Sequence, residues 1–212
     1  MDDALRHGAL RARAEIVSGR LRGEALLALL LEVPPFDRDA WVDALLGIED
    51  LPEDVPDLPR GAVLYLPCGV DEILATLREL RIRPGDHFVD LGSGLGRVSI
   101  LFHLLSGVRA SGIEIQGPLV ESARLRCAAL GLTGVSFVHA NAADLELDGS
   151  HFFLYAPFNG ELLERVLARL EDVARERPVV VCAVGTELHG VRWLRARRTL
   201  SVVVTIYDSS WD

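Results

Sequence analysis

The pattern of hydrophobic and polar positions changes character at about residue 60. Before it, stretches rich in Ala, Leu, Arg and Glu predict two helices within residues 4–32. A third helix is expected to follow, with Trp41 on its buried face and Asp37 or Asp39 as its cap. Residues 49–60 are rich in proline and acids, which predicts a linker or an extended strap.

We therefore expect an N-terminal helical extension with an acidic linker at residues 1–60, followed by a second unit at residues 61–212. In the second unit, a helix at 70–80 precedes short apolar runs that alternate with helical stretches. The expected strands are 87–91, 109–115, 135–139, 152–155, 179–184, 193–196 and 200–207, with helices at 118–130 and 160–176 among them.

Continuous apolar strands joined by helices form a parallel sheet that is covered on both faces. The last two expected strands have no helix between them, so we expect them to form an antiparallel hairpin at the sheet edge. The predicted fold class is therefore α/β, with a doubly wound, mostly parallel sheet of seven strands and an N-terminal helical extension.

A glycine-rich loop follows the first strand directly and contains Gly92, Ser93, Gly94 and Gly96. Glycines at alternate positions permit a sharp turn and let backbone N–H groups approach a ligand closely. Asp90, at the carboxyl end of the strand, is expected to face the same crevice. Because a carboxylate repels a pyrophosphate but suits an ammonium group, this spacing favours S-adenosylmethionine over a dinucleotide.

A second acidic residue supports a nucleoside ligand. Glu114 ends the next strand, 18 residues beyond Gly96, where a carboxylate can accept hydrogen bonds from both ribose hydroxyls. The same region nearly satisfies the dinucleotide fingerprint, with Ser99 in place of the final Gly or Ala, so an NAD-dependent oxidoreductase is an alternative. A catalytic Tyr-x-x-x-Lys is impossible, however, because the chain contains no lysine.

From about residue 83 to its end, the chain resembles the class I, Rossmann-like, S-adenosylmethionine-dependent methyltransferases. The resemblance implies binding of S-adenosylmethionine, with S-adenosylhomocysteine as product and no metal. The family commonly has an acidic residue after the third strand that faces the adenine; here Asn141 takes that position, with Asp144 as the alternative. The cofactor-binding residues that it implies are Asp90, Gly92, Ser93, Gly94, Gly96, Glu114, Ile115, Asn141, Ala142 and Tyr155.

After the fourth strand, the family places the residues that face the methyl acceptor. The segment 155–159 is similar to the Asn/Asp-Pro-Pro-Tyr/Phe motif only in Pro157 and Phe158. Tyr155 or Ala156 occupies the position of the Asn or Asp that would hold a planar amine, which argues against methylation of a nucleic-acid base.

A narrower resemblance is to the seven-strand protein-lysine methyltransferases. It rests on the glycine-rich loop together with the preceding segment Tyr65-Leu66-Pro67 and helix. It implies that the segment before the first strand folds over the cofactor, with Tyr65 and Glu72 lining the site. The candidate catalytic residues are accordingly Tyr65, Glu72, Tyr155 and Asn159. A protein that binds the cofactor without turnover is a further alternative.

Charge and cysteine content restrict the partners. The formal net charge of −9 argues against bulk binding of nucleic acid or of a membrane surface. The longest apolar run, at residues 25–31, is far too short to span a bilayer, and the acidic first residues are unlike a secretory leader. Three cysteines far apart in sequence argue against disulfides and against a cysteine metal site, so we expect a cytoplasmic protein.

The acceptor is left open between a small molecule and a protein side chain, possibly lysine, and the oligomeric state is undetermined. One hypothesis concerns the acids of the expected strap, which would steer a cationic acceptor toward the site. These acids are Glu49, Asp50, Glu53, Asp54 and Asp57.

Overall fold

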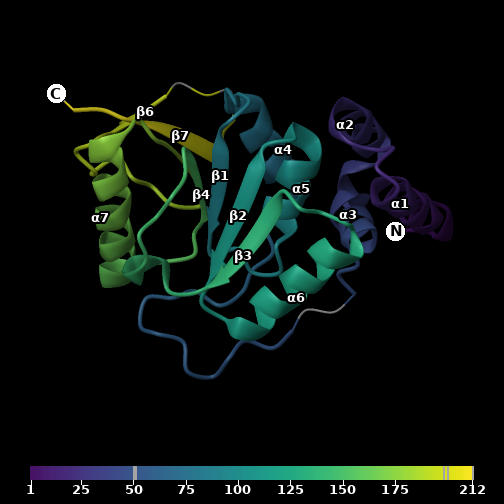
Figure 1. Cartoon of the computed structure of the whole chain (residues 1–212), viewed down its shortest axis with the longest axis horizontal. Coiled ribbons are helices and arrows are strands. Elements are labelled where there is room, and N and C mark those ends of the chain that lie inside the picture. The colour runs from purple at the N-terminus through teal and green to yellow at the C-terminus, as the bar shows by residue number, and fades with distance from the viewer. Residues whose placement is uncertain (50–51, 198, 200, 212) are drawn as a thin grey trace.

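The computed structural model describes residues 1–49, 52–197, 199 and 201–211. A seven-stranded sheet occupies the middle of the molecule, with helices on both faces and the N-terminal helices at one side (Figure 1). The helices are α1 (Asp3–Val17), α2 (Gly23–Glu32), α3 (Arg38–Leu46), α4 (Val70–Glu79), α5 (Arg97–Ser106), α6 (Gly117–Ala129) and α7 (Gly160–Glu176), with short 3-10 turns η1 (Pro35–Asp37) and η2 (Ala142–Asp144). The strands are β1 (His87–Leu91), β2 (Arg109–Glu114), β3 (Val135–His139), β4 (His151–Tyr155), β5 (Val180–Val184), β6 (Leu194–Ala196) and β7 (Val204–Ser209).

The sheet confirms the predicted fold class. Its strand order is β3-β2-β1-β4-β5-β7-β6, and only the two pairings made by β7 are antiparallel among the described residues. The hairpin therefore places its second strand beside β5 and its first strand at the edge. This order brings the carboxyl ends of β1 and β4 together in the middle of the sheet, which is where open α/β sheets bind ligands.

The second strand of the hairpin differs from the predicted range of 200–207. β7 runs from Val204 to Ser209, and Leu200 lies outside the described residues. The shift follows from pairing with β5, because Val184 lies opposite Val204 and Val180 lies opposite Asp208. The β-branched residues just before β7 have no such partner, and Val202 is fully exposed.

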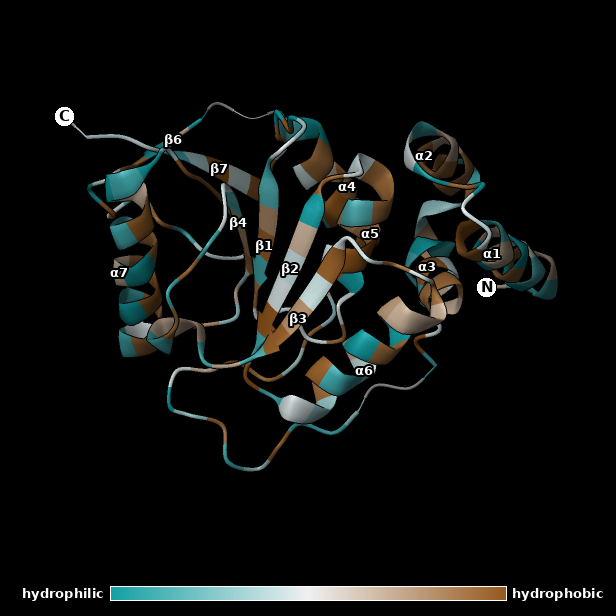
Figure 2. Ribbon diagram, viewed as in Figure 1, coloured by the Kyte–Doolittle hydropathy of each residue, from teal (hydrophilic) through white to brown (hydrophobic). Residues whose placement is uncertain are grey.

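Two hydrophobic clusters cover the two faces of the sheet. One contains Phe88 and Phe153 and packs under α4, α5, α6 and the N-terminal helices. The other contains Val89 and Leu154 and packs under α7. Figure 2 shows the apolar side of α7 turned toward the sheet and its polar side turned outward.

The N-terminal helices share the first of these clusters. Trp41 and Leu45 of α3 belong to the same hydrophobic cluster as Leu101 of α5, so the core continues across residue 60. The division of the chain at residue 60 into an extension and a second unit stays a prediction.

Asp37 occupies the N-cap position of α3, as one of the two alternatives predicts, but its side chain makes no capping hydrogen bond. The Oδ1 atom of Asp39 instead accepts a hydrogen bond of 2.8 Å from the backbone N–H of Val70, at the start of α4. The reason is that Gly69, which precedes α4, has no side chain with which to cap that helix.

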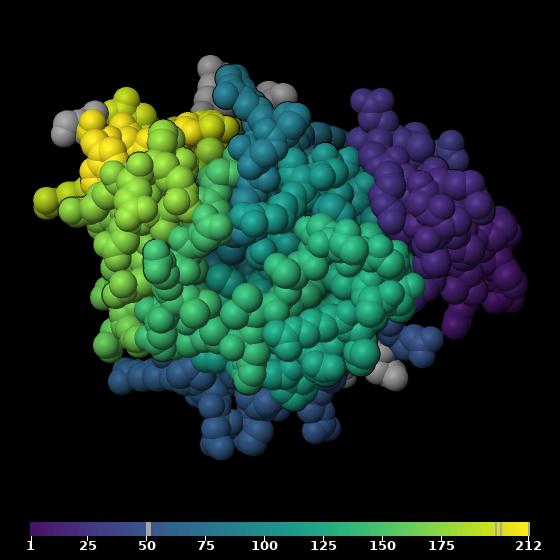
Figure 3. Space-filling model, in the orientation of Figure 1, coloured from purple at the N-terminus to yellow at the C-terminus, as the bar shows by residue number. Residues whose placement is uncertain are grey.

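A strap formed by residues 52–66 crosses the carboxyl edge of the sheet. Its far end pairs with the loop after β4, through Val63 N–H to Pro157 O (3.1 Å) and Asn159 N–H to Gly61 O (2.8 Å). Its near end is held where the Val55 N–H donates to Gln116 Oε1 at 2.8 Å. In Figure 3 the blue atoms of this strap line the lower edge of the molecule.

Candidate functional site

The glycine-rich loop leaves β1 in a backbone conformation that favours glycine. Gly92 and Gly94 have φ angles of +83° and +52°. A side chain at Gly94 would lie 2.1 Å from the ring of Tyr65, and one at Gly92 would lie 2.4 Å from Pro157. The loop is therefore in close contact with the strap on one side and with the segment after β4 on the other.

Glu114 holds the glycine-rich loop from the end of β2. Its carboxylate is buried, and its Oε2 atom accepts a hydrogen bond of 2.9 Å from the Gly94 N–H. Its Oε1 atom accepts one of 2.8 Å from the Gln116 N–H. Because each carboxylate oxygen has two lone pairs, both oxygens can still accept a hydroxyl from a ligand.

Asp90 lies beneath the loop. Its side chain is only 2% exposed, and its Oδ2 atom accepts a hydrogen bond of 3.0 Å from the Ser99 hydroxyl. Burial raises the pKa of Asp90 to about 7, with a further increase from the nearby charge of Glu114. Asp90 is thus poised between its neutral and charged forms near physiological pH, and a cationic ligand would favour the charged form.

A cavity of about 240 Å³ opens at the carboxyl edge of the sheet, beneath the strap. Seven of the predicted site residues line it: Tyr65, Gly92, Glu114, Ile115, Asn141, Ala142 and Tyr155. Six other predicted residues are not among its described lining: Glu72, Asp90, Ser93, Gly94, Gly96 and Asn159. The cavity is therefore formed mainly by the residues that follow β2, β3 and β4, together with the strap.

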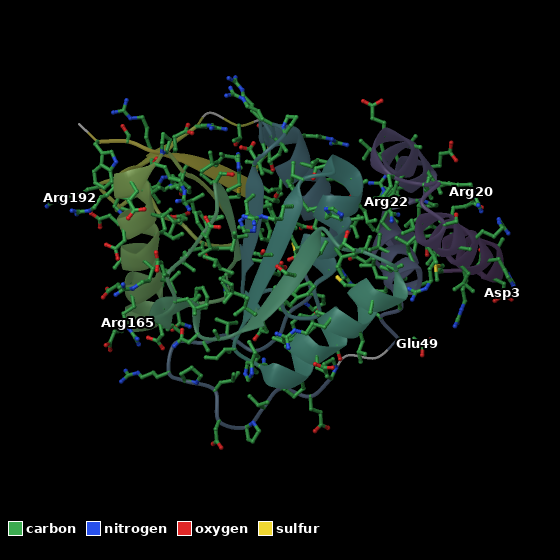
Figure 4. The ribbon with its side chains drawn as sticks, viewed as in Figure 1. Asp3, Arg20, Arg22, Glu49, Arg165 and Arg192 are labelled. Carbon is green, nitrogen blue, oxygen red and sulfur yellow. The ribbon has the colours of Figure 1, made fainter. Side chains whose placement is uncertain are left out.

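Asn141 is the better of the two candidates for the adenine-facing position. It lines the cavity, and its Oδ1 atom accepts a hydrogen bond of 3.0 Å from the Ala143 N–H, which fixes its side chain. Asp144 is exposed and pairs with Arg165, which extends from α7 (Figure 4). One lone pair of Oδ1 and the NH₂ group of Asn141 remain available to a ligand.

The four candidate catalytic residues lie in different surroundings. Burial raises the pKa of Tyr65 to about 12, and burial also raises the pKa of Tyr155. Both phenols are therefore hydrogen-bond donors at neutral pH and not bases. The carboxylate of Glu72 folds back toward Gly69, where an added side chain would lie 2.2 Å from Glu72 Oε2. Asn159 is exposed just before α7.

Two polar residues that position the site were not predicted. Gln116 lines the cavity, and its Nε2 donates a hydrogen bond of 2.6 Å to Asp54 Oδ1. The same Asp54 oxygen accepts a hydrogen bond of 2.9 Å from the Tyr65 N–H, so the pair fixes both ends of the strap that carries Tyr65. The partners are more than 60 residues apart in the chain, which no local pattern reveals.

Arg97 is the second such residue, at the end of the glycine-rich motif. Its guanidinium is buried and donates to both carboxylate oxygens of Asp43 at 2.6 Å. It also donates a hydrogen bond of 2.9 Å to the carbonyl of Cys68. Arg97 therefore ties the glycine-rich loop to α3 and to the segment before α4.

The described residues contain neither a metal-binding cluster nor a helix able to span a membrane. Within them, no group of three or more His, Cys, Asp or Glu side chains is arranged to hold a metal ion. No helix that they form is long and apolar enough to cross a membrane.

Comparison with known proteins finds methyltransferases among the sequence relatives. No family model matches the chain. The protein-L-isoaspartate O-methyltransferase of Methylorubrum extorquens (strain PA1) is 34% identical over 127 residues, which are 56% of this chain and 49% of that enzyme. The chain spans about half the length of the curated relatives that it matches.

Two solved structures share the fold. An RNA methyltransferase from Salinibacter ruber, in complex with S-adenosyl-L-homocysteine, superimposes with a TM-score of 0.53 at 24% identity, covering 68% of this chain and 92% of that one. A mutant of MtNAS in complex with S-adenosylmethionine has a TM-score of 0.58 at 13% identity and covers 98% of this chain and 77% of that one.

The fold and the site define an open α/β protein with a cavity at the carboxyl edge of its sheet. The strand order is that of the class I, Rossmann-like methyltransferase fold, and the chain is similar in sequence to protein-L-isoaspartate O-methyltransferases.

Proposed function

We propose that the protein is an enzyme that transfers a methyl group from S-adenosylmethionine to an acceptor yet to be identified. The observation that carries this proposal is the buried carboxylate of Glu114. It lies at the end of β2, lines the cavity and holds the backbone of the glycine-rich loop. A carboxylate at that place suits the two hydroxyls of a ribose.

The other residues around the cavity fit the rest of that cofactor. Asn141 and the Ala142 backbone line the end of the cavity beyond Glu114, where they can meet an adenine ring. Asp90 lies under the glycine-rich loop, and its carboxylate suits the ammonium group of a methionyl moiety. When bound, S-adenosylmethionine supplies a methyl group on a positively charged sulfur, and an electron pair of the acceptor displaces S-adenosylhomocysteine from it.

The chain itself contributes orientation and exclusion of water. Tyr65 covers Gly94 from the strap, and Pro157 covers Gly92 from the segment after β4. Holding the two reactants in line under such a cover removes a large part of the free-energy barrier to methyl transfer. The Tyr65 and Tyr155 hydroxyls can donate hydrogen bonds at neutral pH but do not remove protons, because both phenols have raised pKa values.

The acceptor named for the curated relatives, an isoaspartate residue, is not part of this proposal. Isoaspartate carries a carboxylate, and no described residue that lines the cavity has a positively charged side chain to receive one. We also propose that the enzyme acts in a bacterial cytoplasm. Support comes from relatives in Methylorubrum and Escherichia coli and from scattered free cysteines, which suit a reducing compartment.

Turnover can be tested without knowing the acceptor. The purified protein is incubated with S-adenosylmethionine and fractionated bacterial metabolite extract, and S-adenosylhomocysteine is quantified by mass spectrometry. We expect at least one fraction to support its formation, together with a product that is heavier by one methylene group. Glu114→Gln should abolish this activity, whereas Glu121→Gln, on the exposed side of α6, should not. Tight binding of S-adenosylhomocysteine with no turnover in any fraction would contradict an enzyme and favour a cofactor-binding protein.

A further inference from the structure

The two ends of the cavity differ in chemistry. One end, at residues 113–116 and 140–142, carries the groups that suit the cofactor. The other end, which we call the acceptor half, is lined by residues 62–66 of the strap, residues 155–158 after β4 and Leu162. Apart from the two tyrosine hydroxyls, every described side chain in the acceptor half is apolar.

None of the described residues that line the acceptor half has a charged side chain. Glu114 is the only carboxylate among the described lining residues, and its oxygens hold the Gly94 and Gln116 N–H groups at the cofactor end. A lysine ammonium in the acceptor half would lose its hydration without gaining an ionic partner. Burying an unpaired charge costs several kcal/mol, and burying a neutral apolar group costs nothing comparable.

The acids of the strap do not supply the missing charge. The Asp54 carboxylate is used internally, by Gln116 Nε2 and the Tyr65 N–H. Glu53 and Asp57 are exposed and are not among the lining residues, and Asp50 lies outside the described residues. The hypothesis that these acids steer a cationic acceptor therefore finds no carboxylate inside the acceptor half.

The mouth of the acceptor half is apolar as well. Leu64 and Leu66 line the cavity, yet they are 64% and 63% exposed. Large apolar side chains exposed at the rim of a cavity are typical of sites for apolar ligands. Backbone hydrogen bonds from Val63 to Pro157 and from Asn159 to Gly61 fix the strap above this half, so the space beneath it suits a small molecule.

We propose that the methyl acceptor is an uncharged small molecule with an aromatic or aliphatic body and a nucleophilic atom that has a free electron pair. This inference rests on the proposed function and specifies its substrate class. The electron pair of the nucleophilic atom forms the new bond to the methyl carbon while the carbon–sulfur bond breaks. Its electrons remain on the sulfur of S-adenosylhomocysteine, and any proton on the nucleophilic atom of the product passes to water.

Three probes that share a phenol ring and differ in charge test this class. The probes are 4-ethylphenol (neutral), tyramine (cationic) and 3-(4-hydroxyphenyl)propionate (anionic). Each is titrated calorimetrically into protein saturated with S-adenosylhomocysteine. We expect 4-ethylphenol to bind at least about tenfold more tightly than either charged probe, because the acceptor half offers no ionic partner.

A matched pair of variants locates the binding. Leu66→Asp places a carboxylate at the rim and should weaken 4-ethylphenol at least about fivefold while favouring tyramine. Leu125→Asp introduces the same charge on α6 at a residue of nearly equal exposure, 62% against 63%, and should leave both affinities unchanged. Both changes are made at exposed positions, where the folded protein tolerates them.

The outcomes separate the two proposals. If S-adenosylhomocysteine binds but tyramine or the propionate is preferred, or none of the probes binds, the neutral acceptor is wrong and the methyltransferase proposal stands. If S-adenosylhomocysteine itself does not bind, the proposed function fails and the acceptor class fails with it.

Discussion

At the scale of single residues, the protonation state of Asp90 is expected to depend on ligand binding. The Asp90 carboxyl group is almost completely buried and accepts a hydrogen bond from the Ser99 hydroxyl. Burial destabilises its negative charge and raises its pKa to about 7 from the ordinary value of 3.8. S-Adenosylhomocysteine carries an ammonium group that compensates this charge. Ligand binding and ionisation of Asp90 are therefore expected to be linked.

The first prediction concerns this linkage. Below about pH 7 the ligand-free protein holds a proton on Asp90 that it must release on binding. As the pH falls further, the affinity for S-adenosylhomocysteine should therefore decrease by up to about tenfold per pH unit. Calorimetry at pH 6 in buffers of different ionisation enthalpy should detect release of about one proton. Asp90→Asn should bind weakly at every pH without proton release. An affinity that does not change between pH 6 and 8 would contradict the linkage.

The same shift predicts an effect on stability. Between about pH 4 and 7 the folded protein binds more protons at Asp90 than the unfolded chain does, so its free energy of unfolding should decrease as the pH rises through this range. Asp90→Asn should remove this contribution to the decrease and should be more stable than the parent above pH 7. Urea unfolding at several pH values measures the difference, and equal slopes in both proteins would speak against it.

Ala156 is a second residue of interest, because its backbone adopts a strained conformation. It is the only described non-glycine residue with a positive φ, +43°, and it lies between Tyr155 and Pro157 in the acceptor half. Since the left-handed conformation costs a residue with a Cβ roughly 1 kcal/mol, Ala156→Gly should stabilise the fold by up to about that amount. Ala196→Gly, in the extended strand β6, should instead destabilise it. Thermal unfolding of both variants checks the sign, and a loss of stability in Ala156→Gly would rule out this strain.

At the scale of elements, the strap and the glycine-rich loop fit together through Tyr65 and Gly94. Gly94→Ala adds a methyl group 2.1 Å from the Tyr65 ring, whereas Gly107→Ala adds one at a similarly positive φ with nothing within 4 Å. Gly94→Ala should therefore be the more destabilising by roughly 1–3 kcal/mol, the usual cost of overpacking. In a Tyr65→Ala background this excess should largely disappear. An excess that persists without the ring would show that the strap does not pack here.

The ion pair between α5 and α3 also acts at this scale. Arg97 is buried and Asp43 partly so. Removal of Arg97 leaves the Asp43 carboxylate without its ion-pair partner, whereas removal of Asp43 leaves Arg97 only a longer contact of 3.5 Å with Asp39. Arg97→Met should reduce the free energy of unfolding by roughly 3–5 kcal/mol, and the double variant with Asp43→Leu should lose much less than the sum of the single changes. A double-mutant cycle by chemical denaturation measures the coupling. Strict additivity would mean that the pair contributes nothing specific.

The sequence predicts local elements better than their long-range contacts. β1, β3 and α7 agree with their predicted ranges, because each is an apolar run or a periodic stretch bounded by turn residues. The shifted β7 depends on its pairing with β5, and the bond from Arg97 to Asp43 joins residues 54 positions apart. The glycine motif and Glu114 are recognisable in the sequence because their spacing is local. The positioning role of Gln116 is not, because it arises only when the strap folds back over the sheet.

At the scale of the whole molecule, the N-terminal helices and the sheet share one hydrophobic cluster. α2 packs against α5 and α3 against α4, and Trp41 lies in this shared core. We therefore expect the entire chain to unfold in one cooperative transition. In a variant that keeps Trp41 and replaces the other two tryptophans by Phe, its fluorescence and the far-ultraviolet circular dichroism should change together. Two separated transitions would instead indicate that residues 1–60 form an independent domain.

The central claim is that the cavity at the carboxyl edge of the sheet binds S-adenosylmethionine through Glu114 and Asp90. The most direct test is calorimetric titration of ligand-free protein with S-adenosylhomocysteine, with NAD as the control ligand. We predict micromolar binding of S-adenosylhomocysteine that Glu114→Gln and Asp90→Ala both weaken, no effect of Glu121→Gln, and no comparable binding of NAD. Absence of S-adenosylhomocysteine binding, or tighter binding of NAD, would contradict the account.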